Sequence, residues 1–210
     1  MPKLTPNQEY CSIARALELL GERWTLLIVR DLLSGPKRFG ELERLVVGVT
    51  PKWLTARLRA LESAGVVERD NRLYRLTPRG QQLRPTLEEL LVWSTAYDAR
   101  PPRPGETIVE EHDMWSLEVF LNRIRPAVAG PVTWAIHLKD GGKHAFQLDG
   151  TQWRWLAGCA AGDVVVMTTA RRWATLLFNL QAGRASAAAD FTISGDPDRV
   201  REFKALAGIR

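Results

Sequence analysis

The sequence predicts an α+β protein with two domains, the first mainly helical with a small β-hairpin and the second built around a β-sheet. A chain of 210 residues with 45% apolar content fits one large or two small globular domains. The Pro-rich stretch 99–105 (ARPPRPG) indicates a linker. Helical periodicity dominates before this stretch, and alternating strand patterns follow it. We therefore expect domains over residues 1–98 and 106–210.

The chain begins with two predicted helices, over residues 5–20 and 22–33. Capping-box spacing in TPNQ at 5–8 favours the start of the first helix, and Gly21 is expected to end it. The second segment is apolar on several sides and is stopped by SGP at 34–36. An apolar surface on several sides predicts that this helix lies in the centre of the core.

A helix-turn-helix is predicted next. Residues 39–45 indicate a short helix, and 46–49 a turn that contains glycine. Thr50 and Pro51 suit the N-cap and first position of another helix, which Gly65 ends. Two helices joined by a tight, Gly-containing turn are typical of this motif.

The helix that starts at Thr50 has one apolar and one polar face. Leu54, Leu58 and Leu61 fall at i, i+4 and i+7, which predicts a buried stripe. Such a helix has the chemistry to enter a DNA major groove, although an ordinary solvated face is the alternative. At about 100° per residue the opposite face carries basic and small side chains, namely Lys52, Ala56, Arg59 and Ser63.

A basic hairpin follows, with strands expected at 66–69 and 73–76 around Asp70-Asn71-Arg72. A helix-turn-helix followed by such a hairpin is a winged helix. Net charge is +5, and ten basic against five acidic residues lie between positions 35 and 80, so double-stranded DNA is the expected partner. We expect Lys52, Thr55, Ala56 and Arg59 to face base edges, and Lys37, Arg38, Thr50, Arg57, Asn71 and Arg72 to hold phosphates.

Residues 11–97 combine these features: Cys11 before the first helix, the block GERWTLLIVRDLLSGPKRFGELERLVVGVTPKWLTARLRALESAGVVER, and LTPRG before a long helix ending near Trp93. This combination resembles the HxlR family of bacterial winged-helix transcription regulators. The family usually has Lys at the position of Arg23 and a longer wing. The resemblance implies a dimeric repressor or activator, and it places Cys11 where some members have a redox-sensing thiol. A helix beginning at Pro6 would put Cys11 too deep to gain from the helix dipole.

A long helix is expected from Thr77-Pro78 to about Arg100, kinked by Pro85. Its apolar positions form a heptad-like stripe. Because winged-helix regulators bind two half-sites, we expect this stripe to form a homodimer seam, with packing on its own domain as the alternative. The seam residues are Leu83, Leu87, Leu90, Leu91, Trp93 and Tyr97.

The second half predicts strands and helices in an α+β order. We expect helices at 112–125, 170–180 and 196–206, and strands at 132–138, 144–148, 151–156, 164–168 and 191–193. Residues 168–209, especially LLFNLQAGRASAAADFTISGDPDRVREFKAL, resemble the end of sterol-carrier-protein type domains. That resemblance implies an apolar cavity between the sheet and the helices that holds a lipid-like ligand.

Aromatic residues are concentrated in this domain. One interpretation is a cavity for a small hydrophobic or aromatic ligand, lined by Trp134, Trp153, Trp155, Trp173 and Phe178. The alternatives are that these side chains fill a core or an interface.

Other functional classes find little support. Cys11 and Cys159 lie far apart, which gives no disulfide framework and favours a reducing, cytoplasmic location. No signal peptide or membrane-spanning run is expected. His112, His137 and His144 fit no zinc spacing; the last two are expected on a solvated sheet face, and no metal or cofactor is predicted.

No catalytic or nucleotide-binding motif occurs, so an enzyme is not expected. The sequence therefore predicts a sequence-specific, ligand-responsive DNA-binding regulator. The alternative is a lipid- or drug-sequestering protein whose winged helix serves dimerisation or protein contact.

Overall fold

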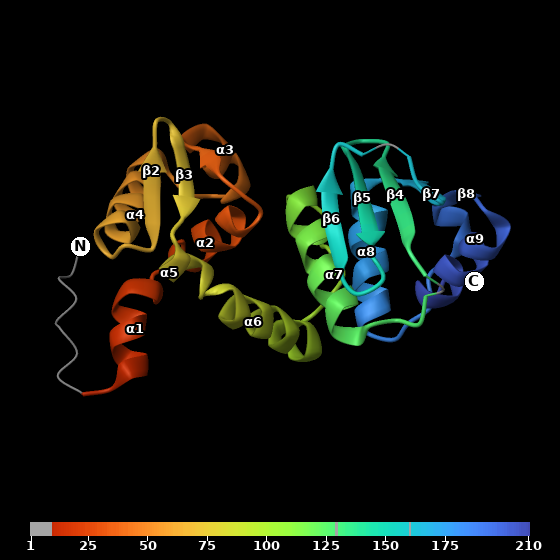
Figure 1. Cartoon of the computed structure of the whole chain (residues 1–210), viewed down its shortest axis with the longest axis horizontal. Coiled ribbons are helices and arrows are strands. Elements are labelled where there is room, and N and C mark those ends of the chain that lie inside the picture. Colours follow the sequence, from red (N-terminus) through yellow and green to blue (C-terminus); the bar gives the residue numbers. More distant parts are fainter. Residues whose placement is uncertain (1–9, 129, 160) are drawn as a thin grey trace. The chain divides into compact units, whose positions relative to one another are not determined.

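The computed structural model describes residues 10–128, 130–159 and 161–210 (Figure 1). The chain forms two compact units, Met1–Glu89 and Leu90–Arg210. The division falls inside helix α6 (Arg84–Tyr97), earlier than the domain boundary expected after residue 98. Each unit has its own sheet, so a mixture of helices and strands is present in both, as the sequence predicts.

The first unit is a helical domain with a three-stranded antiparallel sheet in the order β1-β3-β2. Its elements are α1 (Ser12–Leu20), α2 (Thr25–Leu33), β1 (Lys37–Arg38), α3 (Phe39–Leu45), α4 (Pro51–Ser63), β2 (Val67–Asp70), β3 (Leu73–Leu76) and α5 (Pro78–Gln81). Helices α3 and α4 with the β2–β3 hairpin form the winged helix-turn-helix arrangement.

The core of the first unit brings α2, α3 and α4 together with the hairpin. Ile28 of α2 and Leu42 of α3 are fully buried. From α4, the predicted stripe Leu54, Leu58 and Leu61 is buried to within 1%. Burial of this stripe orients α4 about its own axis, because the remaining faces of the helix must then point away from the core.

Two helix boundaries differ from the sequence prediction. The start expected at 5–8 lies outside the described residues, and α1 begins at Ser12. The long helix expected after Thr77 is interrupted between Gln81 and Arg84. Pro85 explains this break, since its ring clashes with the carbonyl four residues earlier and its nitrogen donates no hydrogen bond.

The two-residue strand β1 was not predicted. Lys37 and Arg38 pair with Tyr74 and Leu73 of β3. A strand this short has no periodicity of its own, and only pairing with a segment more than thirty residues away creates it.

The second unit contains a five-stranded sheet with the order β6-β5-β4-β7-β8, in which only β4 and β7 run parallel. Helices α7 and α8 cover one face of this sheet (Figure 1). The elements are α7 (Glu110–Ile124), β4 (Val132–Leu138), β5 (Lys143–Leu148), β6 (Trp153–Ala157), β7 (Val164–Thr168), α8 (Ala170–Gln181), a short 3₁₀ helix (Ala188–Asp190), β8 (Thr192–Gly195) and α9 (Pro197–Leu206).

The outer edge of β6 is covered by side chains of α7. The amide of Asn122 bonds both backbone groups of Trp153, accepting from its N–H and donating to its carbonyl at 2.9 Å each. Glu118 accepts from the N–H of Trp155 at 3.2 Å. These bonds satisfy an edge that would otherwise be open to pairing with another strand, and they fix α7 against the sheet.

We expect Asn122→Ala to destabilise the second unit by about 1–3 kcal/mol, because two backbone groups of a partly buried strand edge lose their partners. Urea unfolding followed by circular dichroism measures this effect. The exposed Gln152→Ala, directly before β6, is the control and is expected to change stability by less than about 0.5 kcal/mol. An equal effect of both substitutions would contradict the structural role of the amide.

Candidate nucleic-acid interface

Helix α4 presents the polar face that the sequence predicts. Lys52, Ala56 and Arg59 are exposed, and Thr55 is half-buried beside them. The buried leucines lie on the opposite side. The exposed face therefore has two long cations with the methyl group of Ala56 between them.

The start of α4 is positioned by local hydrogen bonds. The hydroxyl of Thr50 accepts from the Trp53 N–H at 3.4 Å, which caps the helix. In the preceding turn Gly48 has φ +83°, a conformation that a residue with a Cβ rarely adopts. Glu41 caps α3 by accepting from the Arg38 N–H at 2.7 Å. These contacts set the path of the chain between the two helices.

The cations predicted for DNA contact fall into two groups. Lys52, Arg59 and the exposed Arg72 have no hydrogen-bond or ion-pair partner among the described residues. By contrast, the ammonium of Lys37 donates to the Ser34 hydroxyl at 3.1 Å and to the Gly35 carbonyl at 3.3 Å. The first group keeps its full charge available for an external anion.

Arg57 lies away from the exposed face of α4. Its side chain is only 18% exposed, and its Nη1 lies 3.9 Å from Oε1 of Glu22. The guanidinium also lies over the Trp53 ring, 6.0 Å from its centroid. Its Nε is enclosed without a partner among the described residues. Arg57 thus forms an ion pair with Glu22 of the same unit. Its contact with a phosphate stays a prediction.

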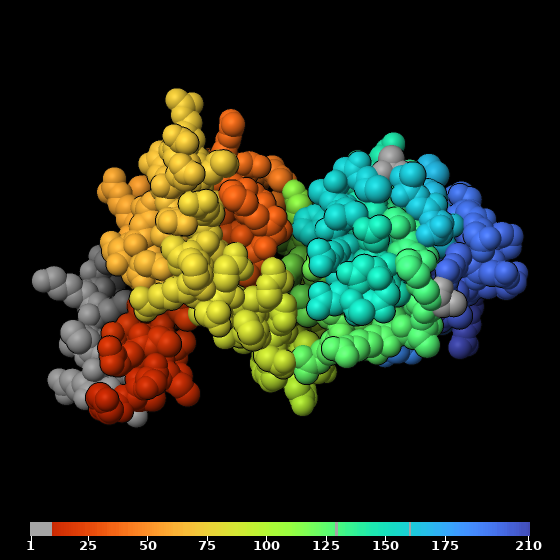
Figure 2. Space-filling model, viewed as in Figure 1, coloured from red at the N-terminus to blue at the C-terminus, as the bar shows by residue number. Residues whose placement is uncertain are grey.

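The tip of the β2–β3 hairpin projects from the first unit (Figures 1 and 2). Asn71 adopts φ +55°, which asparagine tolerates better than most residues, and its amide donates to Asp70 at 3.2 Å. Arg72 follows at the tip, whereas Arg75 further along pairs with Glu68 at 2.9 Å. Among the described residues Arg72 therefore has no acidic partner, and neither has Arg69 of β2, whose guanidinium lies 5.4 Å from the Tyr74 ring centroid, while the acid Asp70 lies beside the tip.

The residues predicted for a dimer seam do not share one environment. Leu87 is buried and Leu83 half-buried, which agrees with the alternative of packing on their own domain. Leu90, Trp93 and Tyr97 are exposed by 45%, 56% and 77%, and Leu91 is half-buried. Only the second part of α6 therefore leaves a large apolar surface.

An apolar face on α1 was not assigned a role from the sequence. Ile13 and Leu17 are 72% and 56% exposed, and α1 contains no buried residue. Their spacing of four residues marks them as one face of a helix, but the sequence does not show that this face lacks a partner within the chain.

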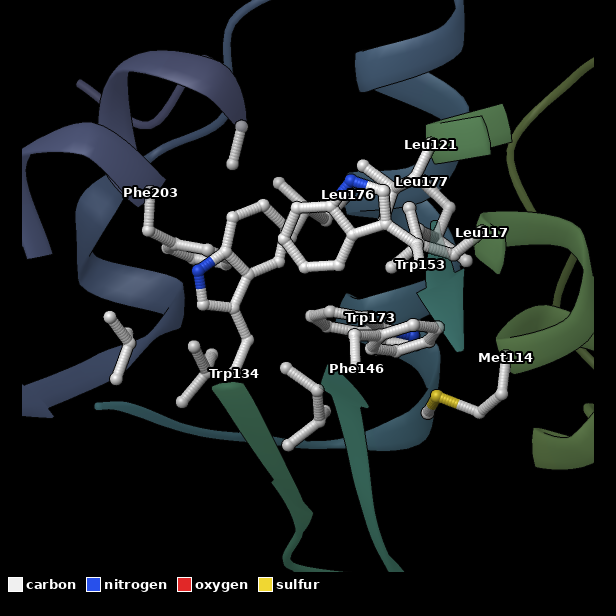
Figure 3. Close-up of a cluster of buried hydrophobic side chains, with 14 of the residues drawn as sticks. Met114, Leu117, Leu121, Trp134, Phe146, Trp153, Trp173, Leu176, Leu177 and Phe203 are labelled. Carbon is white, nitrogen blue, oxygen red and sulfur yellow. The ribbon is translucent and has the colours of Figure 1, made fainter. Parts of the chain in front are cut away.

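Three of the five residues proposed to line a ligand cavity belong to the core of the second unit (Figure 3). Trp134, Trp153 and Trp173 are at most 3% exposed. The rings of Trp134 and Trp153 lie 4.2 Å apart, and Phe203 meets Trp134 edge-on at 5.1 Å. This agrees with the alternative that these aromatics fill a core. Trp155 is half-buried and packs against this core, and Phe178 is half-buried.

His144 is not on a solvated sheet face, so that expectation was wrong. It is 6% exposed, and its Nε2 lies 2.9 Å from Oε2 of Glu110. Its Nδ1 accepts from the indole N–H of Trp155 at 3.2 Å. His137 pairs in register with Lys143, so the two histidines point to opposite faces of the sheet. Among the described residues no cluster of His, Cys, Asp and Glu is suited to hold a metal ion.

Cys11 is also placed differently from the prediction. It occupies the N-cap of α1 and is half-buried, because the helix starts at Ser12 and not near Pro6. The argument that it lies deep inside a helix is therefore wrong, while a redox role stays a prediction.

None of the described helices has the length and apolar character that a bilayer crossing needs.

Comparison with known proteins places the similarity in the first half of the chain. Residues 19–101 match the family described as HxlR-like helix-turn-helix. An uncharacterised HTH-type transcriptional regulator of Mycobacterium tuberculosis is 41% identical over 100 residues, which are 44% of this chain. The match covers 63% of that relative's length. The HTH-type transcriptional regulator YodB of Bacillus subtilis is 35% identical over 103 residues, covering 46% of this chain and 88% of YodB.

Solved structures show similarity over the same fraction of the chain. Quinone-bound YodB from B. subtilis is 36% identical and covers 40% of this chain and 97% of its own, with a TM-score of 0.39. The redox regulator HypR in its oxidised form is 28% identical, and the match covers 43% of this chain and 100% of the HypR chain, with a TM-score of 0.40.

Proposed function

Because the chain belongs to the HxlR-like helix-turn-helix family, we propose that it is a sequence-specific DNA-binding transcription regulator that acts as a homodimer. The observation that carries the proposal is the set of unpaired cations on α4 and at the wing tip, Lys52, Arg59 and Arg72. Such residues neutralise phosphates and release counterions when they bind a duplex.

Helix α4 is the element proposed to read sequence. Arg59 and Lys52 carry donors that match the acceptors on the major-groove edge of guanine. Ala56 between them is small, which favours close approach of the helix to the bases, and Thr55 adds a hydroxyl and a methyl group. The N-terminus of α4 at Thr50 is proposed to contact the DNA backbone, because helix N-termini favour phosphate. Arg38, at the start of α3, is proposed to contact a phosphate as well.

The wing is proposed to position the protein on the duplex. Arg72 and Asn71 lie at the tip of the hairpin that directly follows α4 in the chain, on the same compact unit. Contacts from this tip to phosphates or the minor groove add affinity with little dependence on sequence.

Dimerisation is proposed because two half-sites require two copies of α4. The exposed Trp93 and Tyr97, whose rings lie 5.9 Å apart, support a role for the end of α6. Apolar patches of this kind on a surface helix are typical of protein interfaces.

A ligand response is proposed for the second unit, supported by the resemblance of residues 168–209 to sterol-carrier-protein type domains. A ligand there would change DNA affinity by a coupling energy of about 1–3 kcal/mol. The curated relatives are named as transcription regulators, which favours this role over ligand sequestration alone.

We expect Arg59→Ala to cost about 1–3 kcal/mol on a duplex that the wild-type chain selects from a random pool, and much less on random duplex. Fluorescence anisotropy at fixed salt measures both affinities. Arg154→Ala, an exposed arginine on β6, is the control and should change neither. Equal losses on selected and random duplex would refute the assignment of Arg59 to a base edge.

Arg72→Ala is expected to weaken binding to all duplexes alike and to reduce the slope of log K against log salt by about 1, because one phosphate contact is lost. The measurement is a salt titration of selected and random duplex. A loss confined to the selected duplex would assign this residue to base recognition instead.

Trp93→Asp is expected to weaken self-association at least about tenfold, since a charge would be buried at the interface. Sedimentation velocity over a concentration series measures it. Gln152→Asp introduces the same charge at an exposed position outside α6 and is the control. An unchanged dimer in the Trp93 variant would remove α6 from the proposed seam.

A further inference from the structure

The second unit contains an open cavity of about 360 Å³ between the segment 98–106, α7 and α8. Its wall is polar on the side of the segment, where Arg100 and Glu106 lie, and on α7, where Asp113 lies. The side formed by α8 is largely apolar, with Ala174, Leu177 and Phe178. The volume falls within the range of small-molecule sites.

The segment that forms one wall is held firmly against α8. The guanidinium of Arg171 donates to the carbonyls of Pro102, Arg103 and Glu106 at 3.4, 3.1 and 3.3 Å. The expected linker is thus attached to the second unit by hydrogen bonds, which fix this wall of the cavity from within the chain. Pre-organisation of this kind reduces the entropic cost of binding.

The charges of Arg100 and Glu106 compensate each other. Arg100 forms a two-fold ion pair with the Glu106 carboxylate, which also accepts from the Arg103 N–H at 2.7 Å. The side-chain bond from Arg100, followed by the backbone bond from Arg103, lowers the pKa of Glu106 to about 2. This pair therefore contributes no net charge to the cavity.

Asp113 has no such partner. Its Oδ2 is enclosed and has no hydrogen-bond donor among the described residues. Burial, and then the charge of Glu110 one turn earlier on α7, raise the pKa of Asp113 to about 7. Glu110 itself accepts from Gly142 N–H at 2.8 Å and contacts His144. Asp98 adds a further acid to the lining, and the α8 residues that line the cavity are uncharged.

We propose that this cavity binds a small organic cation, an amine with an apolar body, whose ammonium group faces Asp113. The apolar body would lie against Leu177 and Phe178, and the ammonium would supply the positive charge that the Asp113 carboxyl lacks. An enclosed carboxylate without a donor is otherwise costly and holds a proton instead. The site is separate from the buried tryptophans, and the proposal does not depend on DNA binding.

Folding stability provides the first test. The ordinary pKa of an aspartate is about 3.9, so between about pH 4 and pH 7 the folded chain holds a proton that the unfolded chain releases. Stability from this group is present below about pH 4 and is lost as the pH rises to about 7. Asp113→Asn stays neutral, so we expect it to raise Tm by several degrees at about pH 8 and to leave Tm unchanged at about pH 4. A lower Tm for this variant at the higher pH would overturn the assignment of an unpaired carboxyl.

Binding of probe amines provides the second test, by isothermal titration of the full chain without DNA. We expect 2-phenylethylamine and benzyltrimethylammonium to bind, and the neutral 2-phenylethanol and the anion phenylacetate to bind at least about tenfold more weakly. Affinity for the amines should rise about tenfold from pH 6 to pH 8, as Asp113 ionises. Asp113→Asn should remove this preference, while Asp198→Asn, an exposed acid on α9, should keep it.

A further variant tests whether the amine binds in this cavity. Ala174→Leu fills the cavity from α8 without changing its charge, and we expect it to weaken amine binding at least about tenfold. Absence of amine binding to the wild-type chain would overturn the proposal. Equal binding of amine and alcohol, or unchanged amine binding in Ala174→Leu, would also overturn it. None of these outcomes bears on DNA affinity, which is measured separately.

Discussion

The structure of the candidate interface depends on the burial of one apolar stripe. Leu54, Leu58 and Leu61 are almost fully removed from solvent in the core of the first unit. At about 25 cal/mol per Å², burying a leucine contributes roughly 1.5–3 kcal/mol, which is more than a surface ion pair contributes. The hydrophobic stripe therefore sets the orientation of α4, and the outward direction of Lys52 and Arg59 is its consequence.

The same constraint explains why charge alone is a poor guide to the interface. Basic residues are frequent between positions 35 and 80, but several have internal partners. Arg57 lies beside Glu22, and Arg75 pairs with Glu68. What distinguishes Arg59 and Arg72 is the absence of a partner among the described residues, a property of the folded unit that the composition of the segment does not reveal.

In the second unit, buried indoles fill the core, and side chains of α7 cover one edge of the sheet. Trp134 and Trp173 are the largest fully buried side chains of the core between the sheet and the helices, and Trp153 packs beside them (Figure 3). The amide of Asn122 and the carboxylate of Glu118 bond backbone groups of Trp153 and Trp155, which blocks further strand pairing at the β6 edge of the sheet. The cavity of about 360 Å³ lies outside this filled core, at the segment 98–106.

Local signals in the sequence were sufficient for most elements. The cap at Thr50, the glycine at position 65 and the leucine spacing of α4 act over a few residues, so α4 and its exposed face were predictable, as were β4, β7 and α9. Tertiary structure decided what depends on distant residues. The pairing of β1, the burial of His144 beside Glu110 and the unpartnered carboxyl of Asp113 arise only when separate segments meet. Desolvation and pairing are set by the neighbours in space, and a linear pattern does not contain those neighbours.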